Sequence, residues 1–458
     1  MKPFVTMARF CVALLAVPIA SQGAAAGPTT TAFVHVNVLP MDRDAVLADQ
    51  TVIVEGSRIR AVGHNLPVPA NAEVIDGKGR YLSPGLADMH THSESREDMK
   101  VYLANGVTSL LNLGGASSDF VDQRVPLLDR QERPGPHVYL ALRIDGTPQY
   151  GQLVVKTPAE ARSVVRLAKT NGYEFIKVYN NLSASVFAAV ADEARVQGLG
   201  IAGHYVRALT LGEELKPGHV LVAHLEELMY GLFTPGDADP LAPPSDAVIR
   251  KAAGLLKANR AFVVADLGTF QTIAAQWGRP AAAKAMFERP EARYVPPEWR
   301  LDWQRDDYIQ KSGSLDRRAA FEARLAKGLN DAKIPLLAGT DAPTIPGIYP
   351  GFSLHDDLDS LVAAGLTRFD ALSTATRTPG EYIKASIRNA EAFGEVKEGY
   401  RSDLILSDRN PLDDLRTLRH PLGVMAGGKY YPAAELGSML DSVASDYARA
   451  SAMGGGKP

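Results

Sequence analysis

The chain has 458 residues, of which 46% are hydrophobic, and its formal net charge at pH 7 is −3. This size and apolar content are sufficient for a large core and favour more than one domain. A nearly balanced charge without a polybasic cluster argues against a nucleic-acid surface and against binding to an anionic membrane.

The first 26 residues have the features of a cleavable secretory signal peptide. Lys2 and Arg9 are basic, an apolar stretch runs from Phe10 to Ala20, and Ala24-Ala25-Ala26 offers a small-residue cleavage site. The apolar stretch is too short to span a bilayer comfortably, so an uncleaved anchor is the less favoured alternative. We therefore predict a secreted or periplasmic protein. Its only cysteine, Cys11, would be removed with the signal, which excludes disulfides and thiolate chemistry.

Residues 27–85 are predicted to form the first part of a small β-sandwich domain. The segment Thr51 to Gly63 alternates in polarity around Glu55-Gly56, which is typical of a hairpin. Residues 392–452 are similar, with a short apolar run at 402–407 and a Gly-Gly pair at 427–428 between two more. We therefore predict one sheet domain built from both termini, followed by a disordered tail at 453–458.

The middle of the chain, residues 86–391, alternates between short apolar runs and helical patterns. Thr157-Pro158-Ala159-Glu160, for example, combines a helix N-cap, a first-turn proline and a capping-box acid. Eight units over about 255 residues match an α/β fold of the (β/α)₈ (TIM) barrel type. The candidate strands end near His92, Leu113, Arg143, Tyr179, His204, His224, Leu267 and Asp341.

Two connections in the middle region, 233–245 and 268–333, are unusually long. The second contains all three tryptophans, Trp277, Trp299 and Trp303. Long loops on a barrel often act as lids over an active site. An aromatic cluster that packs the insertion onto the barrel is an equally good interpretation.

Five groups of polar residues stand at the ends of predicted strands: His90-Thr91-His92, Lys177, His204, His224 and Asp341. The first group offers two imidazoles on one side of a strand, because side chains alternate with a period of two. Imidazole and carboxylate are good ligands for zinc and related divalent metals. Because the carboxyl ends of all barrel strands meet on one face, we expect these groups to converge there.

Lys177 lies between Ile176 and Val178 on a strand predicted to be buried. Burial disfavours a charged amine and lowers the pKa of lysine from about 10.4. A neutral amine can react with carbon dioxide to form a carbamate, whose two oxygens could bridge two metal ions. The alternative is a neutral lysine hydrogen-bonded in a polar pocket.

These motifs resemble those of the amidohydrolase superfamily, metal-dependent hydrolases that include dihydroorotases, hydantoinases and carbamylated-lysine dipeptidases. The matching segments extend over nearly all of the chain beyond the signal. The subgroup that the chain resembles most includes prolidase-like and imidazolonepropionase-like enzymes. The resemblance rests on residues 84–92, 175–179, 202–204, 222–224 and 338–342, with flanking matches at 106–108, 353–358 and 394–408.

The resemblance implies two divalent metal ions, zinc by default. It assigns His90, His92 and Asp341 to the more buried ion, and His204 and His224 to the more exposed one. Lys177, carbamylated to N6-carboxylysine, would bridge the two ions. A hydroxide shared by the ions would attack the carbonyl of a C–N bond, and Asp341 would serve as general base and then as general acid.

The resemblance to this subgroup also favours a dipeptide or an N-acyl amino acid as the substrate. A cyclic amide, as in hydantoinases and dihydroorotases, and a non-catalytic metal-binding role are the alternatives. Tyr205 and Leu225 stand where the family commonly has small residues, which affects the substrate assignment rather than metal binding. The expected partner is a small-molecule amide, with no nucleic acid and no stable membrane span, and a homo-oligomer is compatible with the sequence.

Four further residues are candidates for substrate contact. Arg207, just after His204, could clamp a substrate carboxylate, although a surface arginine on a loop is the slightly better interpretation. Tyr179 and Tyr230 either face the pocket or pack against neighbours. His355, after the last strand, could contact the substrate or orient a metal ligand. Glu226 and Glu227 are interpreted as part of a solvated surface.

Overall fold

The computed structural model describes residues 29–218, 220–232 and 243–454, so the predicted signal peptide and the end of the tail lie outside the described residues. Its centre is a nearly closed barrel of parallel strands in the order β14-β13-β12-β11-β10-β8-β7-β6. The short strand β9 (Leu153–Val154) pairs only with β8. The predicted TIM barrel is therefore confirmed.

All eight predicted barrel strands are present at the expected places. They are β6 (Leu86–Thr91), β7 (Val107–Asn112), β8 (His137–Asp145), β10 (Phe175–Val178), β11 (Gly200–Gly203), β12 (Leu221–Val222), β13 (Phe262–Val264) and β14 (Leu336–Leu337). Across the closing seam the Met89 amide donates to the Ala338 carbonyl at 3.0 Å, and the Thr340 amide donates to the His90 carbonyl at 3.1 Å.

The barrel strands are apolar on both faces because both are covered. Outward residues such as Val165 on α3 (Pro158–Thr170) and Ile176 on β10 belong to the core between the strands and the helices. Inward residues such as Ala141, Phe175 and Ala202 form a second core inside the barrel. Above this inner core, at the carboxyl ends of the strands, the inward side chains become polar.

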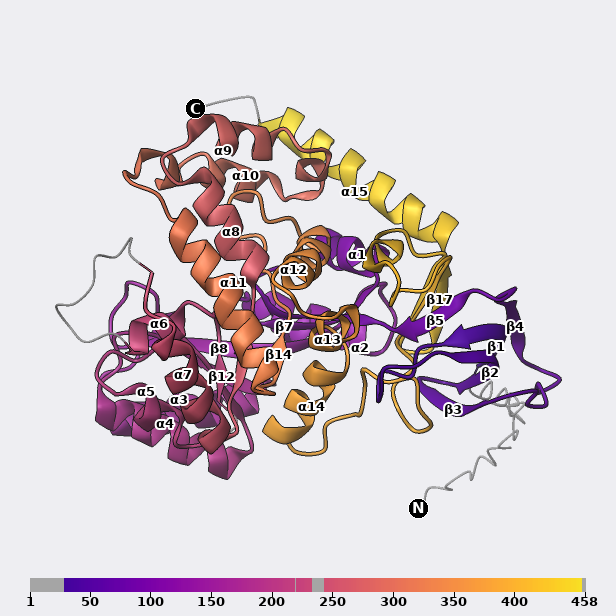
Figure 1. Cartoon of the computed structure of the whole chain (residues 1–458), viewed down its shortest axis with the longest axis horizontal. Coiled ribbons are helices and arrows are strands. Elements are labelled where there is room, and N and C mark those ends of the chain that lie inside the picture. Colours follow the sequence, from indigo (N-terminus) through magenta and orange to yellow (C-terminus); the bar gives the residue numbers. More distant parts are fainter. Residues whose placement is uncertain (1–28, 219, 233–242, 455–458) are drawn as a thin grey trace, which may run out of the picture.

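Helices surround the barrel (Figure 1). They include α1 (Arg96–Ala104), α3, α4 (Ala184–Gln197), α7 (Ala247–Asn259), α11 (Asp316–Asp331), α12 (Phe352–Ala363), α13 (Arg368–Thr374) and α14 (Arg377–Ser386). Helix α3 begins with the capping box expected at Thr157 and Glu160. None of the helices in the described ranges combines the length and the apolar character that a bilayer crossing requires.

The long connection at 268–333 is mostly helical. It includes most of α8 (Leu267–Gln276), then α9 (Pro280–Phe287), η2 (Pro290–Tyr294), α10 (Pro297–Trp303), η3 (Tyr308–Gln310) and α11. Trp303 is only 2% exposed, packs near Val295 and Tyr349, and donates from Nε1 to the Pro343 carbonyl at 2.7 Å. The packing interpretation therefore applies to Trp303. Most of the other long connection, 233–242, lies outside the described residues.

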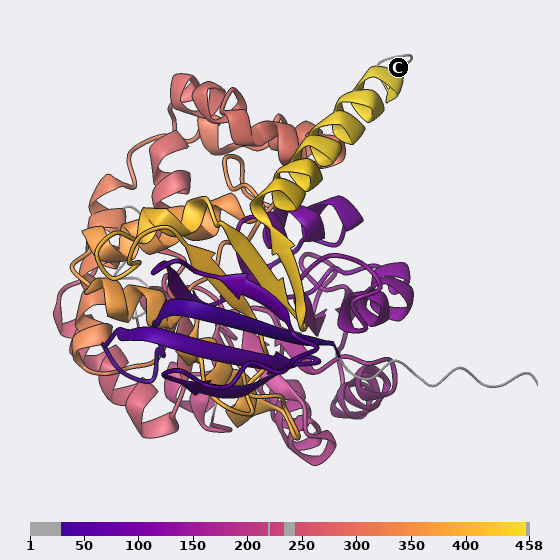
Figure 2. The ribbon, with the colours of Figure 1, turned by 90° about the vertical axis from the view of Figure 1, so that its right-hand side faces the viewer.

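A separate sheet joins the two ends of the chain and fits a small sandwich domain. Its order is β17-β16-β15-β5-β1-β2-β3, with β4 paired to β1. The N-terminal strands are β1 (Thr30–Val38), β2 (Leu47–Glu55), β3 (Arg58–Gly63), β4 (Glu73–Asp76) and β5 (Tyr81–Pro84); the C-terminal ones are β15 (Leu404–Ser407), β16 (Gly423–Ala426) and β17 (Lys429–Pro432). Figure 2 shows the indigo and yellow strands side by side, joined where β5 pairs with β15.

The chain after β17 departs from the prediction. Residues 433–454, expected to belong to the sheet domain and the disordered tail, form the long helix α15 (Ala433–Gly454). Its apolar residues Leu436, Met439, Val443 and Tyr447 recur every three or four positions, so they form a stripe on one side of a helix. This stripe packs on α1 and η2 rather than extending the sheet.

Candidate metal centre

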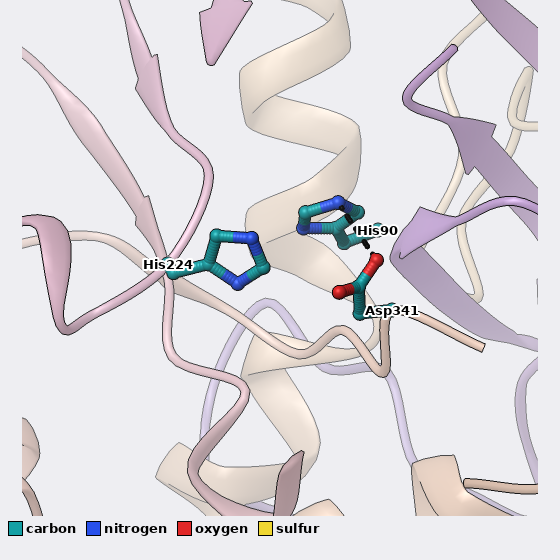
Figure 3. Close-up of side chains that lie close together, drawn as sticks. All are labelled: His90, His224 and Asp341. Atoms are coloured by element: carbon teal, nitrogen blue, oxygen red, sulfur yellow. Dashed lines mark ion pairs between the residues drawn. The ribbon is translucent and has the colours of Figure 1, made fainter. Parts of the chain in front are cut away.

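Four histidines and one aspartate meet at the carboxyl end of the barrel, as expected of strands that share one face. The ring centroids of His90 and His92 lie 5.4 Å apart, those of His90 and His224 4.4 Å, and those of His204 and His224 4.8 Å. Ligand atoms of His90, His224 and Asp341 all lie within 4.8 Å of one another. Figure 3 shows these three side chains converging, with the Asp341 carboxylate beside the His90 ring and His224 on the other side of that ring.

Each imidazole is oriented through its Nδ1 atom. His90 Nδ1 donates to the Ala223 carbonyl at 2.9 Å, and His92 Nδ1 donates to the Gly114 carbonyl at 2.6 Å. A carbonyl oxygen can only accept, so in these two rings Nδ1 carries the proton. When the rings are neutral, each Nε2 therefore presents a lone pair to the centre, which is the tautomer that metal-binding histidines use.

The other two imidazoles are oriented by carboxylates. His204 Nδ1 lies 2.6 Å from Glu227 Oε1, and His224 Nδ1 lies 2.5 Å from Asp266 Oδ2. His204 Nε2 is buried and has no hydrogen-bond partner among the described residues. A buried acceptor without a donor is costly, and a cation in the centre would remove that cost.

Asp341 supplies a second argument for a cation. Its Oδ1 lies 3.4 Å from His90 Nε2 and 3.1 Å from His92 Nε2. Because Nδ1 holds the proton in both neutral rings, three acceptor atoms face one another at short range. A divalent ion coordinated by all three would turn this repulsion into attraction, so the residues present fit a metal site.

Lys177 lies in the same cluster. Its side chain is fully buried, and its Nζ is 3.1 Å from His90 Nε2. Burial lowers the pKa of Lys177 to about 8, although the negative charge of Asp341 acts in the opposite direction. The sequence expectation of a lysine with an easily removed proton is therefore consistent with its surroundings.

The pKa shifts of the histidines reflect how each ring is held. Burial lowers the pKa of His90 and of His92, and the positive charge of Lys177 lowers both further. Burial also lowers the pKa of His204, to about 4, despite the opposing charge of Glu227. For His224 burial acts in the same direction, but the charge of Asp266 outweighs it and raises the pKa to about 9.

Several known proteins are similar to this chain in sequence or in fold. No family model matches the sequence. An imidazolonepropionase from Arthrobacter sp. (strain FB24) is 34% identical over 100 residues, which cover 19% of this chain and 25% of the relative. A dihydroorotase from Staphylococcus epidermidis is 27% identical over 194 residues, which cover 41% of this chain and 42% of the relative. The chain thus matches less than half of the length of either curated relative.

Solved structures extend the likeness to the whole fold. Bottromycin amidohydrolase aligns with a TM-score of 0.70 at 22% identity, over 92% of this chain and 91% of that one. A Xaa-Pro dipeptidase with bound methionine in the active site aligns with a TM-score of 0.63 at 18% identity, over 88% of this chain and 100% of that one. At this identity the likeness shows that the chain shares the fold of these amidohydrolases and dipeptidases.

A cavity of about 1180 Å³ opens beside His204. Three of the four residues predicted to contact substrate, Tyr179, Arg207 and Tyr230, line it. Tyr179 stacks on the His204 ring with centroids 3.9 Å apart, so it also closes one side of the metal centre. Arg207 is exposed at the rim of the cavity.

The fourth candidate, His355, lies elsewhere. It is buried on α12, and its Nε2 donates to the Asn105 carbonyl at 2.9 Å. This places it in the helix layer, away from the lining of the cavity, and the prediction of substrate contact is corrected accordingly. Its position after the last strand did not distinguish a residue facing the site from one facing a neighbouring helix.

Two carboxylates that orient ligands were missed by the sequence analysis. Glu227 was interpreted as solvated, but it is only 3% exposed and its other oxygen accepts from the Tyr205 amide at 3.0 Å. Asp266, at the end of β13, was not singled out at all. The available clue was an acid at the end of an apolar barrel strand, where active-site residues of this fold lie.

Asp88 was also not assigned a role. It is fully buried, and it accepts from the Thr340 amide at 3.1 Å, the Thr340 hydroxyl at 2.6 Å and the His90 amide at 3.2 Å. Burial raises the pKa of Asp88 to about 7 despite these hydrogen bonds. Asp88 thus ties β6, which carries two histidines, to the segment that carries Asp341.

Proposed function

We propose that the protein is a metal-dependent hydrolase that cleaves the amide C–N bond of a dipeptide or an N-acyl amino acid. One observation carries this proposal. Each of the four histidines is held through Nδ1 by a carbonyl or carboxylate oxygen, so that its Nε2 is available to a metal ion. The names of its relatives, among them imidazolonepropionase, dihydroorotase and Xaa-Pro dipeptidase, support chemistry at C–N bonds.

Two divalent ions, zinc by default, would be held by the clustered side chains. His90, His92 and Asp341 would hold one ion, and His204 and His224 the other, with Lys177 as N6-carboxylysine between them. A pKa of about 8 leaves roughly a tenth of the Lys177 amine neutral at pH 7, which is the form that reacts with carbon dioxide. When bound, such ions activate water near neutral pH and polarise the amide carbonyl.

The side chains of the protein carry the proton transfers. Burial would raise the pKa of Asp341, but a proton on Nε2 of His90 or His92 would add a positive charge and a hydrogen bond, and these neighbours hold the pKa well below its usual value. Asp341 is therefore ionised, and we assign it as the acceptor of the proton from water and its donor to the leaving amine. Glu227 and Asp266 fix the rings of His204 and His224.

We propose in addition that the mature protein acts outside the cytoplasm. This proposal rests on the features of residues 1–26. Determination of the N-terminal residue of protein purified from a bacterial periplasmic fraction would test it. An intact Met1, or protein found only in the cytoplasm, would contradict it.

The function is tested by assaying purified protein on dipeptides, N-acyl amino acids and cyclic ureides, with metal content measured on the same preparation. We expect amide hydrolysis that is lost on chelation and restored by zinc. Cleavage of hydantoin-like rings alone would favour the cyclic amidase alternative. Bound metal with no hydrolysis of any compound would favour the non-catalytic alternative.

Replacement of the proposed proton carrier sharpens this test. Asp341→Asn should lower kcat by about 10²- to 10⁴-fold, because it removes general acid–base catalysis, while much of the bound metal remains. Asp192→Asn, an exposed aspartate on α4, is the matched control and should keep full activity. Full activity of Asp341→Asn would contradict the assigned role.

A further inference from the structure

Arg143 lies on β8, among the polar side chains above the inner core of the barrel. Tyr139 and Ala141, on the same strand, belong to the apolar core inside the barrel. Side chains alternate along a strand, so Arg143 is the next inward residue after Ala141. It is also paired in register with Lys177 on β10, whose side chain reaches His90. The guanidinium therefore approaches the metal centre from the side next to Lys177.

The backbone of the neighbouring strand leaves room for this arginine. Gly114 follows β7 with a φ of +105°, and a Cβ there would lie 2.5 Å from Arg143 Cβ. No side chain larger than hydrogen fits at that point without a shift. The same Gly114 supplies the carbonyl that orients His92, so the turn that holds a metal ligand also accommodates Arg143.

Arg143 has no acidic partner. Its Nε is buried without a hydrogen bond, and no ion pair joins its guanidinium to any acid in the described ranges. Most other arginines that are partly buried are paired; Arg401, for example, contacts Asp403 at 2.5 Å. A half-buried guanidinium whose Nε is shielded from solvent and has no hydrogen-bond partner is unfavourable, and a ligand that supplies an anion would reduce this cost.

Arg143 stands beside the candidate metal ligand Lys177, because β8 and β10 pair in register at these two residues. Arg143 is half-buried on the strand beside the one that Tyr179 follows, and Tyr179 lines the cavity. Arg207, by contrast, is exposed on the loop after β11.

We propose that Arg143, rather than Arg207, binds the carboxylate of the substrate, so that the substrates are amides whose amino half carries a free carboxylate. This inference rests on the proposed function. The planar guanidinium presents paired donors that match the two oxygens of a carboxylate. Arg143 would determine specificity by placing the scissile bond at the metal centre, and it would take no part in proton transfer.

A carboxylate could also come from the protein itself, as the carbamate on Lys177. The two sources predict different behaviour. If Arg143 binds the substrate carboxylate, its replacement affects only substrates that carry one. If it stabilises the carbamate, its replacement affects every substrate equally and lowers the amount of bound metal.

The experiment compares the fastest N-acyl amino acid of the panel with its decarboxylated analogue, which has the same amide bond. Wild-type protein should prefer the carboxylate by about 10- to 100-fold in kcat/KM, the usual effect of a hydrogen-bonded charge. Arg143→Gln should abolish this preference, mainly through KM, and leave the decarboxylated analogue unaffected. Arg143→Lys should keep part of it, because a point charge replaces the paired donors.

A binding measurement separates this inference from the proposed function. Calorimetry on zinc-loaded protein would compare N-(methylsulfonyl)-L-phenylalanine, which has no hydrolysable amide, with its decarboxylated analogue. The carboxylate form should bind about 10-fold or more tightly to wild type and lose this advantage in Arg143→Gln. Failure of all hydrolysis would overturn the proposed function but leave this binding difference in place.

Three outcomes would overturn the inference. One is equal affinity of wild type for both sulfonamides. Another is an equal fall of both activities in Arg143→Gln with loss of metal, which would assign Arg143 to the carbamate. The third is loss of the carboxylate preference in Arg207→Gln instead. Arg195→Gln, an exposed position on α4, is the control for a general change of charge.

Discussion

The two pairs of histidines in the metal centre are held by different kinds of acceptor. Backbone carbonyls of Ala223 and Gly114 orient His90 and His92, whereas the carboxylates of Glu227 and Asp266 orient His204 and His224. A carbonyl carries no net charge and cannot be changed by substitution of its own side chain. A carboxylate adds a negative charge next to the ring and can be removed by mutation.

This difference shows in the electrostatics of the two pairs. Burial and Lys177 lower the pKa of both His90 and His92, whereas the carboxylate-held rings diverge: burial lowers the pKa of His204 to about 4, and Asp266 raises that of His224 to about 9 against burial. The carbonyl-held pair is kept neutral by desolvation together with the positive charge of Lys177. The carboxylate-held pair depends on charged neighbours, so its affinity for metal should be the easier of the two to change.

Lys177 is proposed to bridge the two pairs, and its removal should have the largest effect. Lys177→Ala should lower bound metal from about two ions per chain to about one, and activity by at least about 100-fold, because the bridging oxygens are lost. Metal analysis and kcat/KM measure both. If the bridge is a carbamate, added short-chain carboxylates should restore part of the activity. No loss of metal would contradict a bridging role and favour a hydrogen-bonded amine.

Removal of the carboxylates should affect only one pair. Asp266→Asn and Glu227→Gln should each weaken the binding of one metal ion by about 10- to 100-fold, because they leave the imidazole less firmly oriented and less basic. Competition with a chelator measures the two affinities separately. Glu213→Gln is the control, since Glu213 is exposed on α5 (Leu211–Leu215) and its carboxylate caps Thr210 rather than orienting a histidine. Equal weakening of both ions would contradict the distinction drawn between the pairs.

Glu214, on α5 (Leu211–Leu215), supports the carboxylate-held side and gives a smaller effect on stability. Its Oε2 accepts from the Val206 amide at 3.0 Å, just after His204. Burial raises the pKa of Glu214 to about 8 from a usual value of 4.5. The protonated form is therefore favoured in the folded state. Its stabilising contribution is complete below about pH 4.5 and is lost as the pH rises through about 8.

Glu214→Gln keeps an acceptor for the Val206 amide but cannot ionise. The free energy of unfolding of this variant should exceed that of wild type increasingly between pH 5 and pH 9, by an amount on the order of a few kcal/mol. Urea denaturation at several pH values measures the difference. Glu213→Gln, an exposed neighbour whose capping hydrogen bonds lower its pKa, is the control and should show no such increase. A constant difference across this range would contradict the assignment.

Much of the fold followed from local patterns. The eight barrel strands were predicted because each is a short apolar run between helical patterns, and the candidate ligands were predicted because each stands at a strand end. The helical stripe of α15 was present in the sequence but was overlooked. His355 shows the limit of position alone, because a residue after a strand can face either the site or a helix.

The sequence by itself determined the order of the strands and the residue types at their ends, because both depend on apolar periodicity and on neighbours in the chain. Only the tertiary structure decided which acceptor orients each imidazole, and that Arg143 stands beside Lys177 without an acid. Contacts such as Asp266 with His224 join residues far apart in the chain. They depend on the closure of the barrel and on side-chain direction, which local patterns do not specify.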